Sequence, residues 1–433
     1  MKRAMAELAG LCILAVFSLV LPLHAQNLPG EIVYTVPGMD KAEARTNLVY
    51  KRDGSDEIKM DIYMPPNLAS GERRPVVLFI HGGPLGANPT PGAKDWPFYK
   101  SYGRLMAASG LVGVTFNHRY VSNKSKDMEI SFSDVEEAIR FVRSNAATYH
   151  VDPDRVALWA FSGGGPHLSI GLRGETPYIR CLISYYGILD LSGAAAGAGE
   201  TPQTMERFSP VAHLLKPNES LPSVLIARAG LERVAGLNAG VELFLSRMLA
   251  LGGDANLLVH PFGRHGFDGS DDDAQSRDII AATVAFLQGR LNRPAEFEIK
   301  KSFLSLLAAG KVDAARDFVQ TKLKASGDKA SFEALLSEDV FVTVGASLSG
   351  QKNLPAAVKV FEWLIELHPN SLTGRGNLAF LYGASGQTEK AVAEVRRALE
   401  LLEADKTLSE AQKADARKQA DALLKGLQAA PAE

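Results

Sequence analysis

Cysteine is nearly absent from this chain of 433 residues, which contains only Cys12 and Cys181. A disulfide framework and a cysteine-based metal site are therefore excluded, and the zinc-hydrolase motif H-E-x-x-H is also missing. Cys181 lies in the apolar run "CLISYYG", where a lone thiol is expected to be a small buried hydrophobic side chain. We expect neither a metal ion nor another cofactor.

An excess of charge is also lacking. The 47 Lys and Arg residues nearly balance the 49 Asp and Glu residues, and the formal net charge is −2. No basic stripe stands out along the chain, so the sequence predicts no nucleic acid partner.

Long apolar runs are scarce, and the segment 8–21 is the one clear case. It follows two positive residues and precedes Ala25, an order typical of a secretory signal peptide spanning 1–25. Leu23 is bulkier than the residue usually found at this place before a cleavage site, so an uncleaved anchor is the alternative. The run is short for a membrane span, which needs about 20 residues. We expect a secreted or periplasmic protein with no stable membrane span once the signal is removed.

Residues 26–292 alternate short β-rich runs with helical patterns. The later runs are apolar throughout, which is typical of a mostly parallel sheet covered by helices on both faces. Residues 47–64 predict an antiparallel hairpin. Ser133 or Asp134 could cap a helix over 135–146, and the apolar residues of 237–251 recur at helical spacing. The expected class is α/β. The expected strands are 47–52, 57–64, 75–82, 110–118, 155–161, 181–187, 223–230 and 256–262.

The composition changes after residue 292. The polar stretch 293–300 contains a proline and predicts a linker, and residues 301–433 have little β pattern. Two segments in this part, "AAVKVFEWLIELHP" and "KAVAEVRRALELLE", align at a period of 34 residues, which pairs Ala357 with Ala391.

Turns of sequence Ser-Gly-Gln precede both segments, at 349–351 and 385–387, and a weaker copy begins at Ala308. The period and the small residues resemble tetratricopeptide repeats over roughly 301–405, with a generic helical bundle as the alternative. Because stable arrays usually need about three or more repeats, we expect this all-α domain to lean on the first domain. It could bind a protein partner, and we expect it to supply no catalytic group.

The stretch "ALWAFSGGGP", 157–166, runs from an apolar strand into Ser162 and three glycines. A nucleophile must stand clear of its sheet, and a sharp strand-to-helix turn achieves this when the flanking residues are small. The pattern is G-x-S-x-G with Ala160 in the first place. The start of the following helix would set its positive end near the serine oxygen. A glycine-rich turn without chemistry is the alternative.

The stretch "LFIHGGP", 78–84, offers the second element of such a site. Acyl transfer needs backbone N–H groups aimed at the developing oxyanion, from this loop and from the residue after the nucleophile. We assign Gly83 and Gly163 to this oxyanion hole, with Gly82 next in line. The residue after Gly83 is a proline, which cannot donate. His81 is expected to brace the loop.

A general base should follow later in the chain, and His265 lies in the Gly-flanked loop "GRHGFDG". His260 still belongs to the preceding strand and is expected to be structural, while His213 is expected to pack or cap a helix. The run "SDDDAQSRD", 270–278, lacks the pattern of a calcium loop and is expected to start a helix.

An acid should orient the second imidazole nitrogen, and it should lie in the loop after the strand 223–230. Glu232 is the candidate there. Asp190 is the alternative acid, and Asp268 is a third.

Taken together, residues 47–290 resemble the α/β-hydrolase superfamily, closest to dienelactone-hydrolase-like and ferulic-acid-esterase-like carboxylesterases. The motifs that carry the resemblance are "KMDIYMP", "HGGP", "VDPDRVALWAFSGGG" and "RHGFDG". The resemblance implies cofactor-free hydrolysis of a small-molecule carboxylic ester through an acyl-enzyme on Ser162. The Ala/Gly-rich segment 191–210 is the expected cap over the substrate, and the sequence does not define the acyl group or the alcohol.

Two other functions remain open at this point. A peptidase of the prolyl-oligopeptidase type shares the serine turn and the His-Gly-Gly loop, but its usual β-propeller has no counterpart before residue 47. A decayed hydrolase that binds a partner through the helical repeats is the other alternative, and the Ser, His and oxyanion elements argue against it. The expected domains are therefore a signal peptide (1–25), an α/β-hydrolase domain (26–292), a linker (293–300) and a helical-repeat domain (301–433).

Overall fold

The computed structural model describes residues 30–85, 91–192, 199–214, 221–293, 295–326, 333 and 335–429. The expected signal segment 1–25 lies outside the described residues. Contacts divide the chain into two compact units that meet between Asn292 and Arg293. In the described part of the chain, no helix combines the length and the apolar character needed to cross a membrane.

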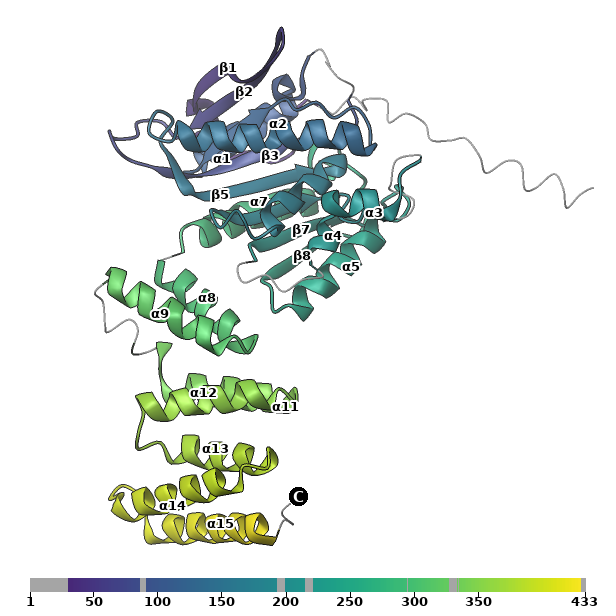
Figure 1. The fold of residues 1–433 in the computed structure, drawn as a ribbon. Coiled ribbons are helices and arrows are strands. Elements are labelled where there is room, and N and C mark those ends of the chain that lie inside the picture. Colours follow the sequence, from purple (N-terminus) through teal and green to yellow (C-terminus); the bar gives the residue numbers. More distant parts are fainter. Residues whose placement is uncertain are drawn as a thin grey trace, which may run out of the picture. The chain divides into compact units, whose positions relative to one another are not determined.

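The described part of the first unit contains an eight-stranded sheet with the strand order β1-β2-β4-β3-β5-β6-β7-β8 (Figure 1). The pairs β1–β2 and β2–β4 are antiparallel, and every other neighbouring pair is parallel. The predicted hairpin and the predicted mostly parallel sheet are therefore confirmed. The strands are β1 (Glu43–Asp53), β2 (Asp56–Met64), β3 (Arg74–Ile80), β4 (Val112–Phe116), β5 (Val151–Phe161), β6 (Ile179–Tyr185), β7 (Ser223–Ala229) and β8 (Ala255–His260).

Strand β3 shows why the strand sequences are apolar throughout. Val76, Leu78 and Ile80 pack into a core on one face of the sheet. Val77 and Phe79 pack into a second core on the other face. Since neighbouring side chains of a strand point to opposite faces, a strand covered on both faces removes all of them from water. The first core also contains residues of α2 (Ser125–Ser144) and α5 (Leu237–Ala250), and the second contains residues of α1 (Pro97–Ala108) and α7 (Ala274–Leu291).

The predicted start of helix α2 is wrong, because the helix begins at Ser125 rather than at Ser133 or Asp134. Asp134 is fully buried within the helix, where its carboxylate pairs with Lys51 Nζ at 2.6 Å and Arg119 Nη2 at 2.8 Å. An acidic residue placed for an ion pair with distant parts of the chain has the same local pattern as a helix cap. The shorter elements are η1 (Met39–Lys41), η2 (Ala93–Asp95), η3 (Ser162–Leu172), α3 (Pro202–Met205), η5 (Glu206–Phe208), α4 (Pro210–His213) and α6 (Phe267–Ser270).

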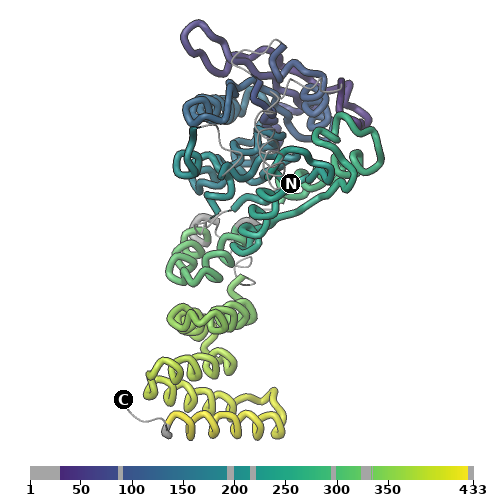
Figure 2. Tube along the Cα trace, turned by 90° about the vertical axis from the view of Figure 1, so that its right-hand side faces the viewer, coloured from purple at the N-terminus to yellow at the C-terminus, as the bar shows by residue number. Residues whose placement is uncertain are grey.

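In the second unit, helices that follow one another in the chain pack side by side and run antiparallel. The helices of residues 338–429 can be followed in Figure 2. Helices α11 and α13 begin 34 residues apart, as do α12 and α14. The Ser-Gly-Gln stretch 349–351 overlaps the end of α11, and the stretch 385–387 lies between α13 and α14. The side chains of Ala357 and Ala391 are fully buried. The identification with tetratricopeptide repeats stays a prediction. The helices are α8 (Ala295–Ala308), α9 (Val312–Ser326), α11 (Glu338–Gly350), α12 (Leu354–Leu367), α13 (Leu372–Ala384), α14 (Thr388–Ala404) and α15 (Glu410–Ala429).

The predicted linker 293–300 is largely helical, because α8 already begins at Ala295. The sequence there, "AEFEIKK", contains Ala, Glu and Lys, which favour a helix, and the proline before it is compatible with a helix start. A polar composition therefore does not distinguish a linker from a helix in this segment.

Candidate active site

The three residues of the expected catalytic triad, and His81, which is expected to brace the oxyanion loop, follow parallel strands of one sheet. His81 follows β3, Ser162 follows β5, Glu232 lies three residues after β7, and His265 lies five residues after β8. The carboxyl ends of parallel strands meet at the same edge of a sheet, so the fold gathers these residues although they are far apart in sequence.

Ser162 has the strained backbone that a sharp strand-to-helix turn requires. Its φ angle is +50°, a left-handed conformation that non-glycine residues rarely adopt. A Cβ atom at Gly164 would lie 2.7 Å from the His81 carbonyl oxygen, and one at Gly163 would lie 2.4 Å from the Gly83 carbonyl oxygen. The turn therefore packs so closely on the loop after β3 that only glycine fits at both positions, which explains the glycines after the serine.

The structure brings Ser162, His265 and Glu232 together in one line of hydrogen bonds. His265 Nε2 lies 2.8 Å from Ser162 Oγ, and His265 Nδ1 lies 2.7 Å from Glu232 Oε2. The serine hydroxyl donates to Nε2, and Nδ1–H donates to the carboxylate. This arrangement can remove the serine proton while the carboxylate stabilises the charge that forms on the imidazole.

The Glu232 carboxylate is fixed on both of its oxygens. Its side chain is 1% exposed, and Oε1 accepts the backbone N–H groups of Arg233 and Val234, both at 2.8 Å. Burial alone would raise the pKa of Glu232, but the hydrogen bond and charge of His265 and the two N–H groups outweigh it. The pKa lies below its usual value, so Glu232 is a carboxylate at neutral pH.

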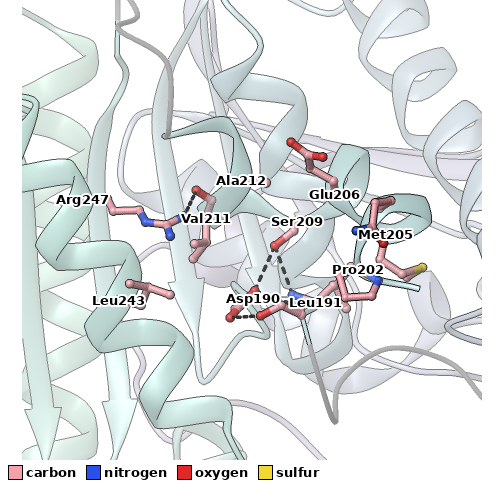
Figure 3. A pocket seen from close by; sticks show the side chains of 12 residues that line it. Asp190, Leu191, Pro202, Met205, Glu206, Ser209, Val211, Ala212, Leu243 and Arg247 are labelled. Atoms are coloured by element: carbon pink, nitrogen blue, oxygen red, sulfur yellow. Dashed lines mark hydrogen bonds between the residues drawn. The ribbon is translucent and has the colours of Figure 1, made fainter. Parts of the chain in front are cut away.

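Asp190, the alternative acid, is engaged elsewhere. Its carboxylate accepts from the backbone N–H and the hydroxyl of Ser192, at 2.9 and 2.7 Å, and from the Ser209 hydroxyl at 3.3 Å. It lines a cavity of about 310 Å³ between the short helices after residue 201 and α5 (Figure 3). That cavity is lined by none of Ser162, Glu232 and His265. Asp190 is therefore not in contact with the imidazole that it would have to orient.

Asp268, the third candidate acid, is fully buried and binds two tyrosines. Tyr102 donates its hydroxyl to Oδ2 at 2.5 Å, and Tyr186 donates to Oδ1 at 2.6 Å. Burial raises the pKa of Asp268 to about 6. Because each oxygen already has a tyrosine hydroxyl, Asp268 holds the aromatic side chains near the site rather than His265 itself.

Tyr186 is a residue of the site that the sequence reasoning missed. Its ring centroid lies 4.6 Å from that of His265, and its φ angle of +38° is strained. Its hydroxyl donates to Asp268, so the Tyr186 ring is held against one side of the imidazole. Its position directly after strand β6, at the edge where the other site residues lie, was the available signal.

Two backbone N–H groups are oriented by hydrogen bonds to the carbonyl oxygens of their own peptide units. His81 Nδ1 donates to Gly82 O at 2.6 Å, and Ile188 N–H donates to Ser162 O at 3.0 Å. Because a trans peptide points its N–H opposite to its C=O, these bonds fix the directions of the Gly83 and Gly163 N–H groups. This contact of His81 holds the loop after β3 in place, which is the structural role expected for His81.

Gly82 does not fit the expected part of a further oxyanion donor. Its N–H already donates to the Tyr99 hydroxyl at 3.3 Å. Tyr99 is buried beside the loop. A sequence cannot reveal such a partner, because the pairing depends on how helix α1 packs against the sheet.

The other expected polar residues have structural contacts. His260 is 3% exposed and pairs with Asp273 at 3.1 Å, and His213 Nε2 contacts the Arg207 carbonyl at 3.0 Å. Asp273 caps helix α7 by accepting the Ser276 N–H at 2.8 Å, as expected for the aspartate run. Within the described ranges, no group of three or more His, Cys, Asp and Glu side chains could hold a metal ion.

The sheet order and the serine turn define the class of this unit, which is an α/β-hydrolase domain of the carboxylesterase-like kind. Residues 60–203 match the family model BD-FAE. Part of the expected cap, 191–210, falls within this match; of it, 193–198 lie outside the described residues, and α3 and η5 occupy 202–208.

Several esterases are similar in sequence to part of this chain. Esterase LipQ of Mycobacterium tuberculosis is 30% identical over 172 residues, which cover 37% of this chain and 39% of that protein. Acetylxylan esterase of Xylanibacter ruminicola is 24% identical over 189 residues, covering 40% and 36%. The chain thus spans less than half the length of these relatives. The solved structure of Thermogutta terrifontis esterase 2 aligns at 22% identity, with a TM-score of 0.47, over 58% of this chain and 94% of that one.

Proposed function

We propose that this chain is an exported serine hydrolase that cleaves small carboxylic esters through an acyl-enzyme on Ser162. The observation that carries the proposal is the continuous line of hydrogen bonds from Ser162 Oγ through His265 to Glu232, at 2.8 and 2.7 Å. Relatives that match part of the chain are named as esterases, which supports an ester as the substrate class.

Acylation begins when Ser162 Oγ attacks the carbonyl carbon of the ester and His265 Nε2 accepts the hydroxyl proton. The carbonyl π electrons move to the oxygen, and the Gly83 and Gly163 N–H groups donate to the oxyanion that results. The carbon–oxygen bond of the ester then breaks, and the leaving alkoxide takes the proton from His265. Glu232 keeps the imidazole oriented and stabilises its positive charge throughout.

Deacylation repeats these steps with water. His265 Nε2 removes a proton from a water molecule that attacks the acyl carbon, the same oxyanion forms, and Ser162 Oγ leaves with the proton. The products are the carboxylic acid and free enzyme. No cofactor takes part in this proposed sequence.

Hydrolysis of p-nitrophenyl acetate by the purified chain tests the proposal, together with covalent labelling by a fluorophosphonate. Mass spectrometry should place the label on Ser162. Ser162→Ala should abolish labelling and hydrolysis, while Ser70→Ala, at an exposed serine outside the site, should keep both. Failure of wild-type protein to hydrolyse or to be labelled would contradict the proposal, and faster cleavage of peptide amides than of esters would favour a peptidase.

Export is the second part of the proposal and rests on the apolar run 8–21 with positive residues before it. N-terminal sequencing of protein recovered outside the cytoplasm should start at Gln26. Recovery of a chain starting at Met1 in the membrane fraction would instead support an uncleaved anchor.

A further inference from the structure

A buried chain of hydrogen bonds joins the loop after β3 to the first turn of η3, and none of the groups between its ends takes part in the proposed reaction. His118 Nδ1 lies 2.9 Å from Ser131 Oγ, which lies 2.8 Å from His167 Nε2. His167 Nδ1 lies 3.1 Å from the Gly164 carbonyl oxygen. The three side chains come from the segment after β4, from α2 and from η3, and each is at most 3% exposed.

The other end of the chain is the imidazole of His81. The rings of His118 and His81 are stacked, with centroids 3.7 Å apart and an interplanar angle of 16°. His81 Nε2 lies 3.2 Å from the His118 carbonyl oxygen and 3.4 Å from the His118 backbone N–H, whereas His81 Nδ1 lies 2.6 Å from Gly82 O. Because a carbonyl oxygen can only accept, the shorter contact places the proton of the neutral ring on Nδ1, which donates to Gly82 O. His118 thus holds the imidazole that orients the Gly83 N–H.

The carbonyl oxygen at one end of this hydrogen-bond chain determines which nitrogen of each imidazole carries the proton. Gly164 O can only accept, so His167 carries its proton on Nδ1 and accepts the Ser131 hydroxyl proton at Nε2. The Ser131 oxygen then accepts from His118 Nδ1–H. His118 Nε2 is left unprotonated, and it has no hydrogen-bond partner among the described residues. Burial lowers the pKa of His81 to about 4 and of His167 to about 3, and it lowers the pKa of His118 well below its usual value, so all three are neutral at pH 7.

The two segments joined by this chain each supply one oxyanion donor. Gly83 belongs to the loop after β3, and Gly163 lies next to Gly164 in the first turn of η3. These donors act only if both N–H groups point at one oxygen atom, at distances near 3 Å. Small displacements of such groups are costly in rate, because the donors must match the tetrahedral intermediate rather than the bound ester.

We propose that Ser131, with His118 and His167, is a positioning group that fixes the Gly163 and Gly83 N–H donors relative to each other. Ser131 is the central link, since its hydroxyl both accepts from His118 and donates to His167. Its removal would leave two buried imidazole nitrogens without partners, and the two segments could then shift to regain hydrogen bonds. This inference rests on the proposed esterase function.

Ser131→Ala tests the inference, with Ser169→Ala as a matched control. Ser169 is also fully buried, lies in η3, and its hydroxyl has no partner in the described structure. With p-nitrophenyl acetate, Ser131→Ala should lower kcat by about tenfold or more and change KM by less than about threefold, as expected for loss of transition-state alignment. Ser169→Ala should stay within about twofold of wild type in both.

Binding of phenylboronic acid gives a second readout that a merely structural role would not move. Boronates form a tetrahedral adduct with a serine hydroxyl that places an oxygen in the oxyanion hole, whereas acetate binds as a planar carboxylate. Ser131→Ala should weaken boronate binding by about the same factor as kcat and leave acetate inhibition nearly unchanged. If Ser131→Ala does not fold by circular dichroism, Ser131→Cys offers the same comparison, because a thiol is a weak donor.

The outcomes separate this inference from the function beneath it. An active wild type with a folded Ser131→Ala variant of equal kcat and boronate affinity would overturn the positioning role alone. Equal losses in Ser131→Ala and Ser169→Ala would also overturn it. A wild-type chain that hydrolyses no ester would overturn the proposed function, and the positioning role with it.

Discussion

His265 Nδ1 lies 2.7 Å from Oε2 of Glu232, a carboxylate whose side chain is 1% exposed and whose other oxygen accepts two backbone N–H groups. This geometry leads to the first prediction. Glu232→Gln should lower kcat about 10³- to 10⁴-fold, because the imidazole loses the charge that stabilises its protonated form and fixes its tautomer. Steady-state kinetics on p-nitrophenyl acetate would measure the loss.

Asp190→Asn is the control for this prediction. Asp190 binds Ser192 and Ser209 and has no contact with His265, so kcat should stay within about tenfold of wild type. If Asp190→Asn lowered kcat more than Glu232→Gln, the assignment of Glu232 as the acid would be wrong.

The second prediction concerns the tight contact behind the nucleophile. A Cβ atom at Gly164 would lie 2.7 Å from His81 O and 2.8 Å from Ile80 O, both backbone atoms that cannot move aside cheaply. Gly164→Ala should therefore reduce the free energy of unfolding of the first unit by about 1–3 kcal/mol and lower kcat. Urea unfolding followed by near-ultraviolet circular dichroism would measure the change.

The matched control is Gly289→Ala. Gly289 lies exposed within helix α7, and a Cβ atom there would meet nothing within 4 Å. This change should stabilise the unit by up to about 1 kcal/mol, because alanine favours a helix over glycine. Equal effects of the two substitutions would argue against a special packing constraint at Gly164.

The sequence allowed the strands and the serine turn to be predicted because both depend on short-range patterns. Strands buried on both faces are apolar throughout, and the predicted strand 155–161 overlaps the observed β5 at its carboxyl end, where Ser162 follows. Glu232 could be chosen because it lies in the loop after β7, where the fold requires an acid.

Contacts between distant segments could not be predicted in this way. Ser131 meets His118 and His167 only because α2 packs on the sheet beside η3, and nothing within a few residues of Ser131 reveals this. Asp134 was mistaken for a helix cap for the same reason, since its partners Lys51 and Arg119 are far away in sequence. Partner-dependent polar residues are thus where local patterns fail.

The third prediction concerns acid pH. The pKa of His81 falls to about 4 and that of His167 to about 3 in the folded protein, and His118 is also lowered by burial. In the unfolded chain these histidines bind protons near pH 6.5, so the unfolded state binds more protons between about pH 6.5 and 4. The free energy of unfolding should therefore fall as the pH falls through this range, by about 1.4 kcal/mol per pH unit for each proton.

Asp268 has the opposite effect on the free energy of unfolding and offsets the contribution of one histidine proton. Its pKa is raised to about 6, so the folded state binds a proton there before the unfolded state does. The net uptake on unfolding should be about two protons between pH 6 and about 4.5. Urea midpoints of the first unit at pH 7.5, 6 and 5 would give this slope, and a flat profile between pH 7.5 and 5 would show that the three histidines are not neutral in the folded protein.

The last prediction concerns the helical unit. Among the side chains that the structure describes, the two cores of the first unit contain none beyond Leu291, and the core of the second unit contains none before Ile299. Every group assigned to the proposed reaction lies before residue 270, in segments that follow strands of the sheet. A chain ending at residue 292 should therefore hydrolyse p-nitrophenyl acetate within about tenfold of the full chain, equivalent to about 1.4 kcal/mol of barrier. A truncated chain that is folded by circular dichroism yet inactive would show that the helical unit completes the active site. Equal activity of the two chains would leave the helices to act in partner binding or in access to the site.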